Sequence, residues 1–168
     1  MNDSPESNFA TRLFERLGPN SQLIDAARGE TISTSEIRAS IRGTAAAFRS
    51  AGLQFGDRVL IGCSLSPAST LAYLGAMYAG LVPVPLEERV LQATGESICI
   101  QPVAKAVWTD RDVDCKWVNR PGVLHFRGTY IGSPESSLKP APRRESDLAA
   151  LMPTSGSTGV PRLVRVTH

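Results

Sequence analysis

The most constraining feature of the sequence is a strand, a helix and a second strand that follow one another with short joins. Residues 58–62 are almost continuously apolar, which is typical of a strand buried on both faces. Ser66 can cap a helix that has Pro67 at its first position, and Gly80 ends it before the apolar residues 82–84. Strands joined through a helix run parallel. The sequence therefore predicts an α/β fold, a parallel-rich sheet with flanking helices built from βαβ units.

Further helices and strands are predicted around this unit. Phe9, Leu13 and Leu17 recur at the spacing of one helical face. Ser33 and Glu36 form the capping pattern S-x-x-E, so another helix begins there. A helix is also expected within residues 87–101, and short strands at residues 22–26, 31–33, 104–109, 123–126, 148–152 and 163–166.

Changes in composition along the chain predict its organisation. Residues 1–8 are polar and acidic and are expected to be a disordered N-terminus, not a signal peptide. Residues 9–132 form an α/β subdomain. Residues 133–147 are rich in serine, proline and charge and are expected to be a connecting loop. Residues 148–168 form a strand, a loop and a strand, in a domain that we expect to be incomplete at its C-terminus.

Charge and cysteine content narrow the classes of function. The net charge is +2 with acidic and basic residues interleaved, which argues against a nucleic-acid-binding surface. Cys63, Cys99 and Cys115 are widely spaced, so neither a disulfide framework nor a zinc site is expected, and a cytoplasmic location fits. The most apolar stretch, residues 71–86, is shorter than the ~20 apolar residues of a membrane span.

A loop of small residues between two apolar strands is the candidate binding site. It contains four hydroxyl side chains and two glycines in six positions: Thr154, Ser155, Gly156, Ser157, Thr158 and Gly159. The glycines let backbone N–H groups approach an anion, and the hydroxyls add donors, so the loop could bind a polyphosphate. Composition alone leaves a flexible connector as an equal alternative. Neither a Walker P-loop nor a G-x-G-x-x-G pattern is present.

The sequence around this loop resembles a known family. The run from Asp147 to His168, with its T-S-G-S-T-G core, closely resembles the ATP-phosphate motif of the adenylate-forming superfamily. That superfamily includes acyl-CoA synthetases, fatty acyl-AMP ligases and adenylation domains of nonribosomal peptide synthetases. Residues 52–59 and 71–86 are similar to two further segments of the family, in family order. The chain is thus identified as a member, corresponding to the first subdomain of the large N-terminal domain.

The resemblance implies a reaction and a set of ligands. Family members use Mg²⁺ and ATP to convert a carboxylic acid to an acyl-adenylate and pyrophosphate. They then transfer the acyl group to the thiol of CoA or of a carrier-protein phosphopantetheine. The loop from Thr154 to Gly159, together with Arg162, would bind ATP. No catalytic residue and no metal ligand is assigned in this chain. Arg162 stands where the family usually has lysine, and Leu163 where it usually has glycine.

The remaining expectations concern completeness and single residues. Because the family's other site segments follow this motif, we expect the chain alone to be inactive, to expose an apolar face and to need a complementing downstream segment. The alternative is a truncated, non-catalytic remnant or interaction module that keeps the fold. The residues Asp110, Asp112 and Asp114 are expected to form a solvated turn. Structural or surface roles are expected for Cys63, Trp108, Trp117, His125 and His168.

Overall fold

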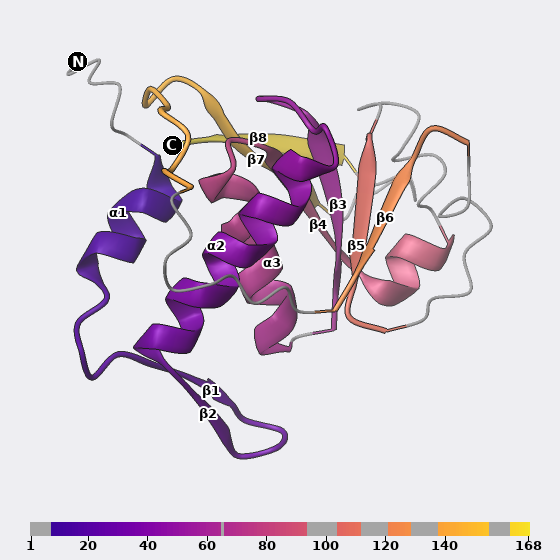
Figure 1. Ribbon diagram of the computed structural model, residues 1–168. Coiled ribbons are helices and arrows are strands. Elements are labelled where there is room, and N and C mark those ends of the chain that lie inside the picture. Colours follow the sequence, from indigo (N-terminus) through magenta and orange to yellow (C-terminus); the bar gives the residue numbers. More distant parts are fainter. Residues whose placement is uncertain (1–7, 65, 94–103, 112–120, 129–137, 155–161) are drawn as a thin grey trace.

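A parallel sheet lies at the centre of the computed structural model, which describes residues 8–64, 66–93, 104–111, 121–128, 138–154 and 162–168. Its four strands are ordered β4-β3-β5-β6 (Figure 1). They are β3 (Arg58–Cys63), β4 (Val82–Glu87), β5 (Ala106–Thr109) and β6 (Leu124–Arg127). All three pairings are parallel. The predicted α/β fold with a parallel-rich sheet is therefore confirmed.

The long helix α2 (Thr34–Ser50) begins at the predicted capping box. The Ser33 hydroxyl accepts the Glu36 N–H, while a Glu36 carboxylate oxygen accepts the Ser33 N–H at 2.8 Å. Both contacts satisfy backbone donors that a helix start leaves unpaired. The helix ends before Gly52, whose φ of 87° is a conformation that glycine adopts without strain.

Helix α3 (Pro67–Tyr78) connects β3 to β4 and lies directly against α2. Ser66 caps it, with Pro67 at the first position, as predicted. The two helices approach so closely that a Cβ at Gly75 would lie 2.8 Å from the Cβ of Thr44. The absent side chain at Gly75 is what permits this helix pair.

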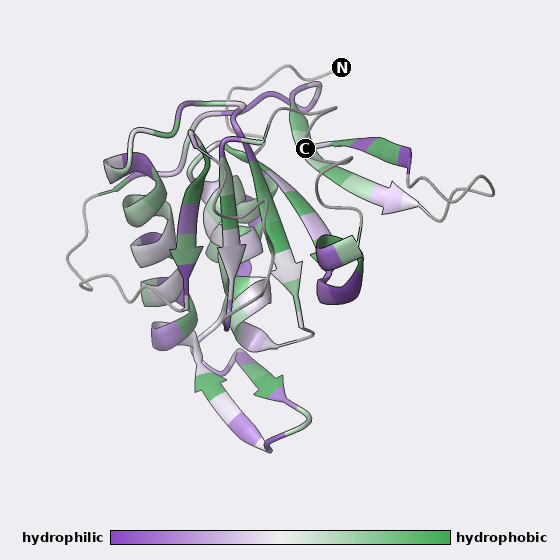
Figure 2. Ribbon diagram, turned by 90° about the vertical axis from the view of Figure 1, so that its right-hand side faces the viewer, coloured by the Kyte–Doolittle hydropathy of each residue, from purple (hydrophilic) through white to green (hydrophobic). Residues whose placement is uncertain are grey.

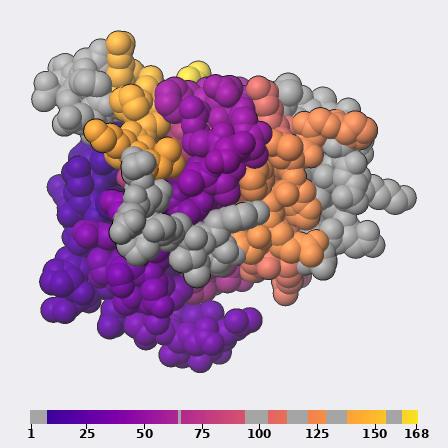
Figure 3. Space-filling model, viewed as in Figure 1, coloured from indigo at the N-terminus to yellow at the C-terminus, as the bar shows by residue number. Residues whose placement is uncertain are grey.

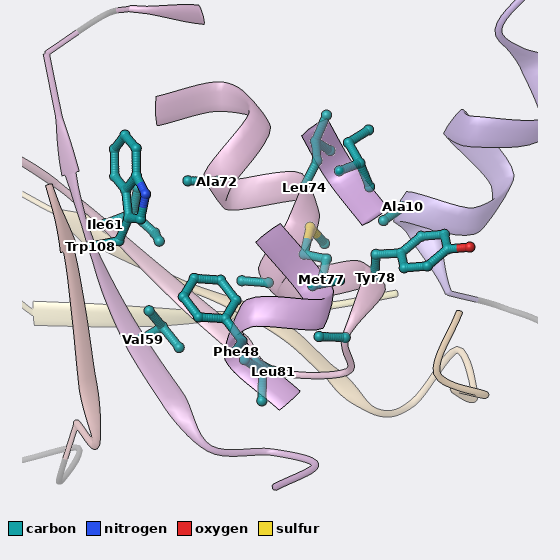
Figure 4. Packing of buried hydrophobic residues seen from close by; sticks show 14 of the residues in the cluster. Ala10, Phe48, Val59, Ile61, Ala72, Leu74, Met77, Tyr78, Leu81 and Trp108 are labelled. Carbon is teal, nitrogen blue, oxygen red and sulfur yellow. The ribbon is translucent and has the colours of Figure 1, made fainter. Parts of the chain in front are cut away.

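One face of the sheet packs against α2 and α3. Alternate strand residues such as Val59, Ile61 and Trp108 point to this face because side chains alternate along a strand. Phe48 of α2 belongs to the same cluster as these residues (Figure 4). Its ring packs edge-on against that of Phe126, with ring centroids 4.7 Å apart. All of these side chains are at most 7% exposed, so this cluster is the main core.

The opposite face of the sheet is covered by later parts of the chain. Leu60 and Val107 point to this side and pack with Leu91, Leu151 and Leu163. Two of these contacts come from an antiparallel pair, β7 (Leu148–Thr154) and β8 (Arg162–Thr167). Green apolar segments run along the central strands between these layers in Figure 2. The sheet is therefore buried on both faces, as its apolar strands indicate.

The N-terminal elements lie at the border of this core. A two-stranded antiparallel hairpin, β1 (Gln22–Asp25) and β2 (Glu30–Ser33), projects from the molecule at the bottom of Figure 1. Helix α1 (Phe9–Arg16) forms where predicted, but Phe9 is 49% exposed and Ala10 is buried instead. The apolar face of α1 is thus centred on Ala10, Leu13 and Phe14, and the prediction that Phe9 belongs to it is wrong.

Asn8 corrects the predicted limits of the N-terminal tail. It was expected to be disordered, yet it caps α1 and is 1% exposed. Its side-chain amide donates to the carbonyls of Met77 and Ala141, at 2.8 and 3.0 Å. These bonds tie the start of α1 to α3 and to the segment 138–147, which lies beside α1 on the surface in Figure 3. Asn8 is therefore a buried, bonded residue and not part of a disordered tail.

Several predictions are tested only in part. Residues 88–93 are helical, while residues 94–101 of the expected helix lie outside the described residues. Residues 138–147 contain no helix and one isolated bridge, whereas residues 1–7 and 133–137 also lie outside. The proposed division of the chain into domains stays a prediction. No helix within the described ranges is long and apolar enough to cross a membrane.

Candidate phosphate-loop site

The two strand ends that would hold the predicted loop lie opposite each other. Thr154, the last residue of β7, is the register partner of Arg162, the first residue of β8. The Thr154 hydroxyl donates to the Arg162 carbonyl at 3.2 Å. The two residues that border the segment 155–161 are therefore held side by side. Ser155, Gly156, Ser157, Thr158 and Gly159 lie outside the described residues.

One side of the β7–β8 pair packs against the sheet, and the other side carries exposed apolar residues. Leu151 is 6% exposed and packs with Leu163 under the sheet. Leu163, which replaces the usual glycine of the family, thus belongs to the packed side. On the outer side Met152 and Val164 are register partners and are 39% and 49% exposed, with Val166 next to them at 40%. These three residues form a group of exposed apolar side chains. Whether a downstream segment covers such a face stays a prediction.

An open cavity of about 620 Å³ lies beside the strand that leads into the loop. Met152 and Pro153 of β7 line one part of it, and Cys63 and Glu88 line another. Arg111 also lines it and donates to the Glu88 carboxylate, which raises the pKa of the Arg111 guanidinium. Sequence reasoning missed Glu88 and Arg111. The signal for both is their place just after parallel strands, where binding residues of α/β sheets gather.

Asp110 corrects a second sequence prediction. It was expected to lie in a solvated turn with Asp112 and Asp114, but its Oδ2 accepts the hydroxyls of Ser64 and Ser66. The Ser66–Asp110 distance is 3.0 Å. Asp110 therefore links the end of β5 to the start of α3. Asp112 and Asp114 lie outside the described residues, and no group that could hold a metal ion exists within them.

The other single-residue predictions concern Cys63, Trp108 and His125. Burial raises the pKa of the half-buried Cys63 thiol, so it stays neutral at physiological pH and is a poor nucleophile. Trp108 is fully buried, which confirms its core role. His125 is exposed and shares a 2.9 Å hydrogen bond with the Thr109 hydroxyl. Trp117, Cys99 and Cys115 lie outside the described residues.

His168 joins the end of β8 to α1. Its Nδ1 accepts the Phe9 N–H at 3.1 Å, and its backbone N–H donates to the Asp147 carbonyl at 3.2 Å. Burial lowers the pKa of the His168 imidazole, with a further lowering from Arg143 and an opposite effect of Asp147. The neutral ring is the form that can accept the Phe9 N–H. The structural role predicted for His168 is confirmed.

This arrangement predicts acid sensitivity. The lowered pKa means that the unfolded chain binds this proton more readily than the folded chain. The free energy of unfolding should therefore fall as pH drops from 7 to 5, by at most about 1.4 kcal/mol per pH unit for one proton. Urea unfolding of the protein and of His168→Gln, which keeps an acceptor but does not titrate, measures the effect. The variant should lose most of this pH dependence. His125→Gln, at the only other histidine, should retain it, and equal slopes in all three proteins would contradict the assignment.

Comparison with known proteins finds one consistent group. The sequence pattern of the family described as AMP-binding enzyme matches residues 15–168. The 4-coumarate–CoA ligase 2 of Petroselinum crispum is 26% identical over 98% of this chain and 33% of its own length. Two solved structures are similar in fold and sequence. ATP-bound MatB from Rhodopseudomonas palustris has a TM-score of 0.83 and 26% identity, over 97% of this chain and 35% of that one.

The second structure is a fatty acyl-adenylate ligase from L. pneumophila in complex with acyl adenylate and pyrophosphate. Its TM-score is 0.73 and its identity is 26%, over 99% of this chain and 30% of that one. The chain therefore spans about a third of the length of the relatives it matches.

Proposed function

The chain belongs to the family of AMP-binding enzymes, and from this premise we propose that it forms the phosphate-binding part of a cytoplasmic AMP-forming acid–thiol ligase. In this reaction a carboxylate oxygen attacks the α-phosphorus of ATP, and the bond to the β-phosphate oxygen breaks. The products are an acyl-adenylate and pyrophosphate. The acyl group then passes to a thiol of CoA or of a carrier-protein phosphopantetheine. The observation that carries the proposal is the pairing of Thr154 with Arg162, which holds the two ends of the loop together.

We propose separate roles for the residues of the loop and its two ends. Thr154 already donates its hydroxyl proton to the Arg162 carbonyl, so it holds the two ends of the loop together. The donors proposed for the β- and γ-phosphates are the hydroxyls of Ser155, Ser157 and Thr158, with the loop N–H groups. Arg162 is exposed and would add a positive charge where the phosphates enter. Positioning and charge neutralisation of this kind are what in-line phosphoryl chemistry requires.

Magnesium is proposed to arrive with ATP. Among the described residues, no cluster of three or more Asp, Glu, His or Cys side chains could hold a metal ion. We therefore assign magnesium no ligand in this part of the chain. Its chemistry would be to neutralise charge on the phosphates. What this chain contributes is the rigid base of the loop, since Leu151 and Leu163 fix β7 and β8 to the sheet.

An exchange assay tests this proposal. We expect no carboxylate-dependent exchange of pyrophosphate into ATP by the 168-residue chain, because its relatives are about three times longer. A chimera in which this chain replaces the matching third of MatB should show exchange. Arg162→Lys in that chimera should keep or raise the rate, since a lysine also neutralises phosphate charge.

The outcomes separate the ligase from the alternative of a non-catalytic module. A folded chimera without exchange, which Arg162→Lys does not restore, would favour the module. Exchange by the 168-residue chain itself would contradict the need for a complementing segment but support the chemistry.

A further inference from the structure

A second cavity, which shares Ser64 and Arg111 with the one beside the loop, lies between the projecting hairpin and the sheet. Its volume is about 650 Å³, which is within the usual range for small-molecule sites. The hairpin β1–β2 forms one wall, and the first turns of α2 and α3 form another. The ends of β3 and β5 supply Ser64, Asp110 and Arg111.

The strand order places this cavity where α/β sheets bind ligands. β4 and β5 flank β3 on opposite sides, so the connections after β3 and β5 lead in opposite directions across the sheet. Ligands of open α/β sheets bind at the carboxyl ends of two such strands. Ser64 and Asp110 directly follow these two strands. The position therefore favours a binding function independently of the lining residues.

The Ser40 hydroxyl in this cavity is available to a ligand. Ser40 of α2 is 5% exposed and lines the cavity. Within the ranges that the structure describes, its hydroxyl makes no hydrogen bond, unlike those of Ser64 and Ser66. A hydroxyl that faces a cavity and has no protein partner can bond to a polar group of a ligand. Ser40 thus marks a place for a ligand polar group.

The free groups around Ser40 are mainly hydrogen-bond acceptors with negative charge. Asp110 uses only Oδ2 for the two serines, and neither Oδ1 nor the Glu30 carboxylate accepts a hydrogen bond in the described part of the chain. The Asp110 charge also acts on the guanidinium of Arg111. The full set of lining carboxylates is Asp25, Glu30, Glu36 and Asp110. The lining guanidiniums are Arg28 and Arg111, and Arg111 is paired with Glu88.

We propose that this cavity, at the ends of β3 and β5, binds an ammonium group carried on an alkyl stem. The ammonium group would donate to Asp110 Oδ1, to Glu30 and to the Ser40 hydroxyl. The stem would contact the apolar lining at Ile32 and Leu71. The lining carboxylates outnumber the lining guanidiniums, and an excess of negative charge in a concave site attracts cations. The ligand is either a small amine or a lysine side chain of a partner protein, because both present this group.

A titration followed by two-dimensional NMR of backbone amides tests the proposal on the 168-residue protein. The probes are 1,4-diaminobutane and Nα-acetyl-lysine methylamide, with 1-butanol and Nα-acetyl-norleucine methylamide as neutral counterparts. We expect saturable shifts at Ser40, Ser64 and Ser66 with at least one cationic probe and with neither neutral one. Saturation by the diamine alone indicates a small amine, and saturation by the lysine analogue alone indicates a partner side chain.

Two carboxylate variants and a matched control complete the experiment. Glu30→Gln lies on the exposed hairpin and should weaken binding about fivefold without unfolding the protein. Asp110→Asn should weaken it by at least as much. Glu15→Gln on α1 changes the net charge equally but lies outside the cavity, so affinity should stay within about twofold. No saturable shift with either cationic probe, equal binding of a neutral probe, or equal weakening by Glu15→Gln would overturn the proposal.

Discussion

Trp108→Ala is expected to lower the free energy of unfolding by about 3–5 kcal/mol, the usual cost of removing a large buried aromatic side chain. Trp108 is fully buried in the centre of β5, with Ile61 and Phe126 as its register partners (Figure 4). Its indole N–H donates to the Gly128 carbonyl at 2.8 Å, so the substitution also leaves an acceptor unpaired. Urea unfolding followed by circular dichroism measures the change. Domains are stable by only about 5–15 kcal/mol, so this loss is a large share of the total free energy of unfolding.

Two controls separate packing from general sensitivity to substitution. Trp108→Phe keeps most of the buried volume but loses the bond to Gly128, and it should cost clearly less than Trp108→Ala. Ile24→Ala, at a hairpin residue that is 63% exposed, should change stability by less than about 0.5 kcal/mol. A Trp108→Ala protein as stable as Ile24→Ala would contradict the core described here.

Replacing Ser155, Ser157 and Thr158 together by alanine is expected to reduce pyrophosphate exchange in the MatB chimera by about 100-fold or more. Each hydroxyl is proposed to donate to a phosphate, and removing one such donor from a preorganised site costs several kcal/mol in the transition state. The melting temperature should stay nearly unchanged, because these hydroxyls are proposed to serve phosphate and not packing.

The same triple variant distinguishes the alternative role of a connector. If the hydroxyls were buried and bonded to backbone, each lost bond would cost about 1 kcal/mol of stability. Thr154→Val provides a matched comparison, since it removes a hydroxyl at the start of the loop that donates to the Arg162 carbonyl. It should lower the melting temperature more than the triple variant does. An active triple variant that melts early would contradict the phosphate assignment.

Much of the fold follows from local sequence signals. The apolar run at β3 and the capped start of α3 predict the parallel sheet, and the Ser33–Glu36 capping box fixes the start of α2. These signals succeed because each depends on neighbouring residues alone. Where burial depends on distant partners, the prediction fails. Phe9 has the helical spacing of a core residue, yet the buried position is Ala10, because Asn8 and His168 set the orientation of α1.

The candidate sites show the same limit. The sequence motif identifies the loop, and the register of Thr154 with Arg162 adds that its two ends are held together. Asp110 could not be assigned from its alternation with Asp112 and Asp114, because its partners Ser64 and Ser66 are more than forty residues earlier. Ser40 gave no signal at all. Its significance depends on a missing partner and on a cavity formed by the hairpin, which only the folded structure shows.

The most direct test of the central claim, that the loop between β7 and β8 binds phosphate, is a calorimetric titration of the 168-residue chain with magnesium pyrophosphate. We expect saturable binding by the wild-type chain. The triple variant that replaces Ser155, Ser157 and Thr158 by alanine should bind about tenfold or more weakly, with an unchanged melting temperature. Binding of equal affinity by the wild-type chain and this variant, or no binding by the wild-type chain, would contradict it.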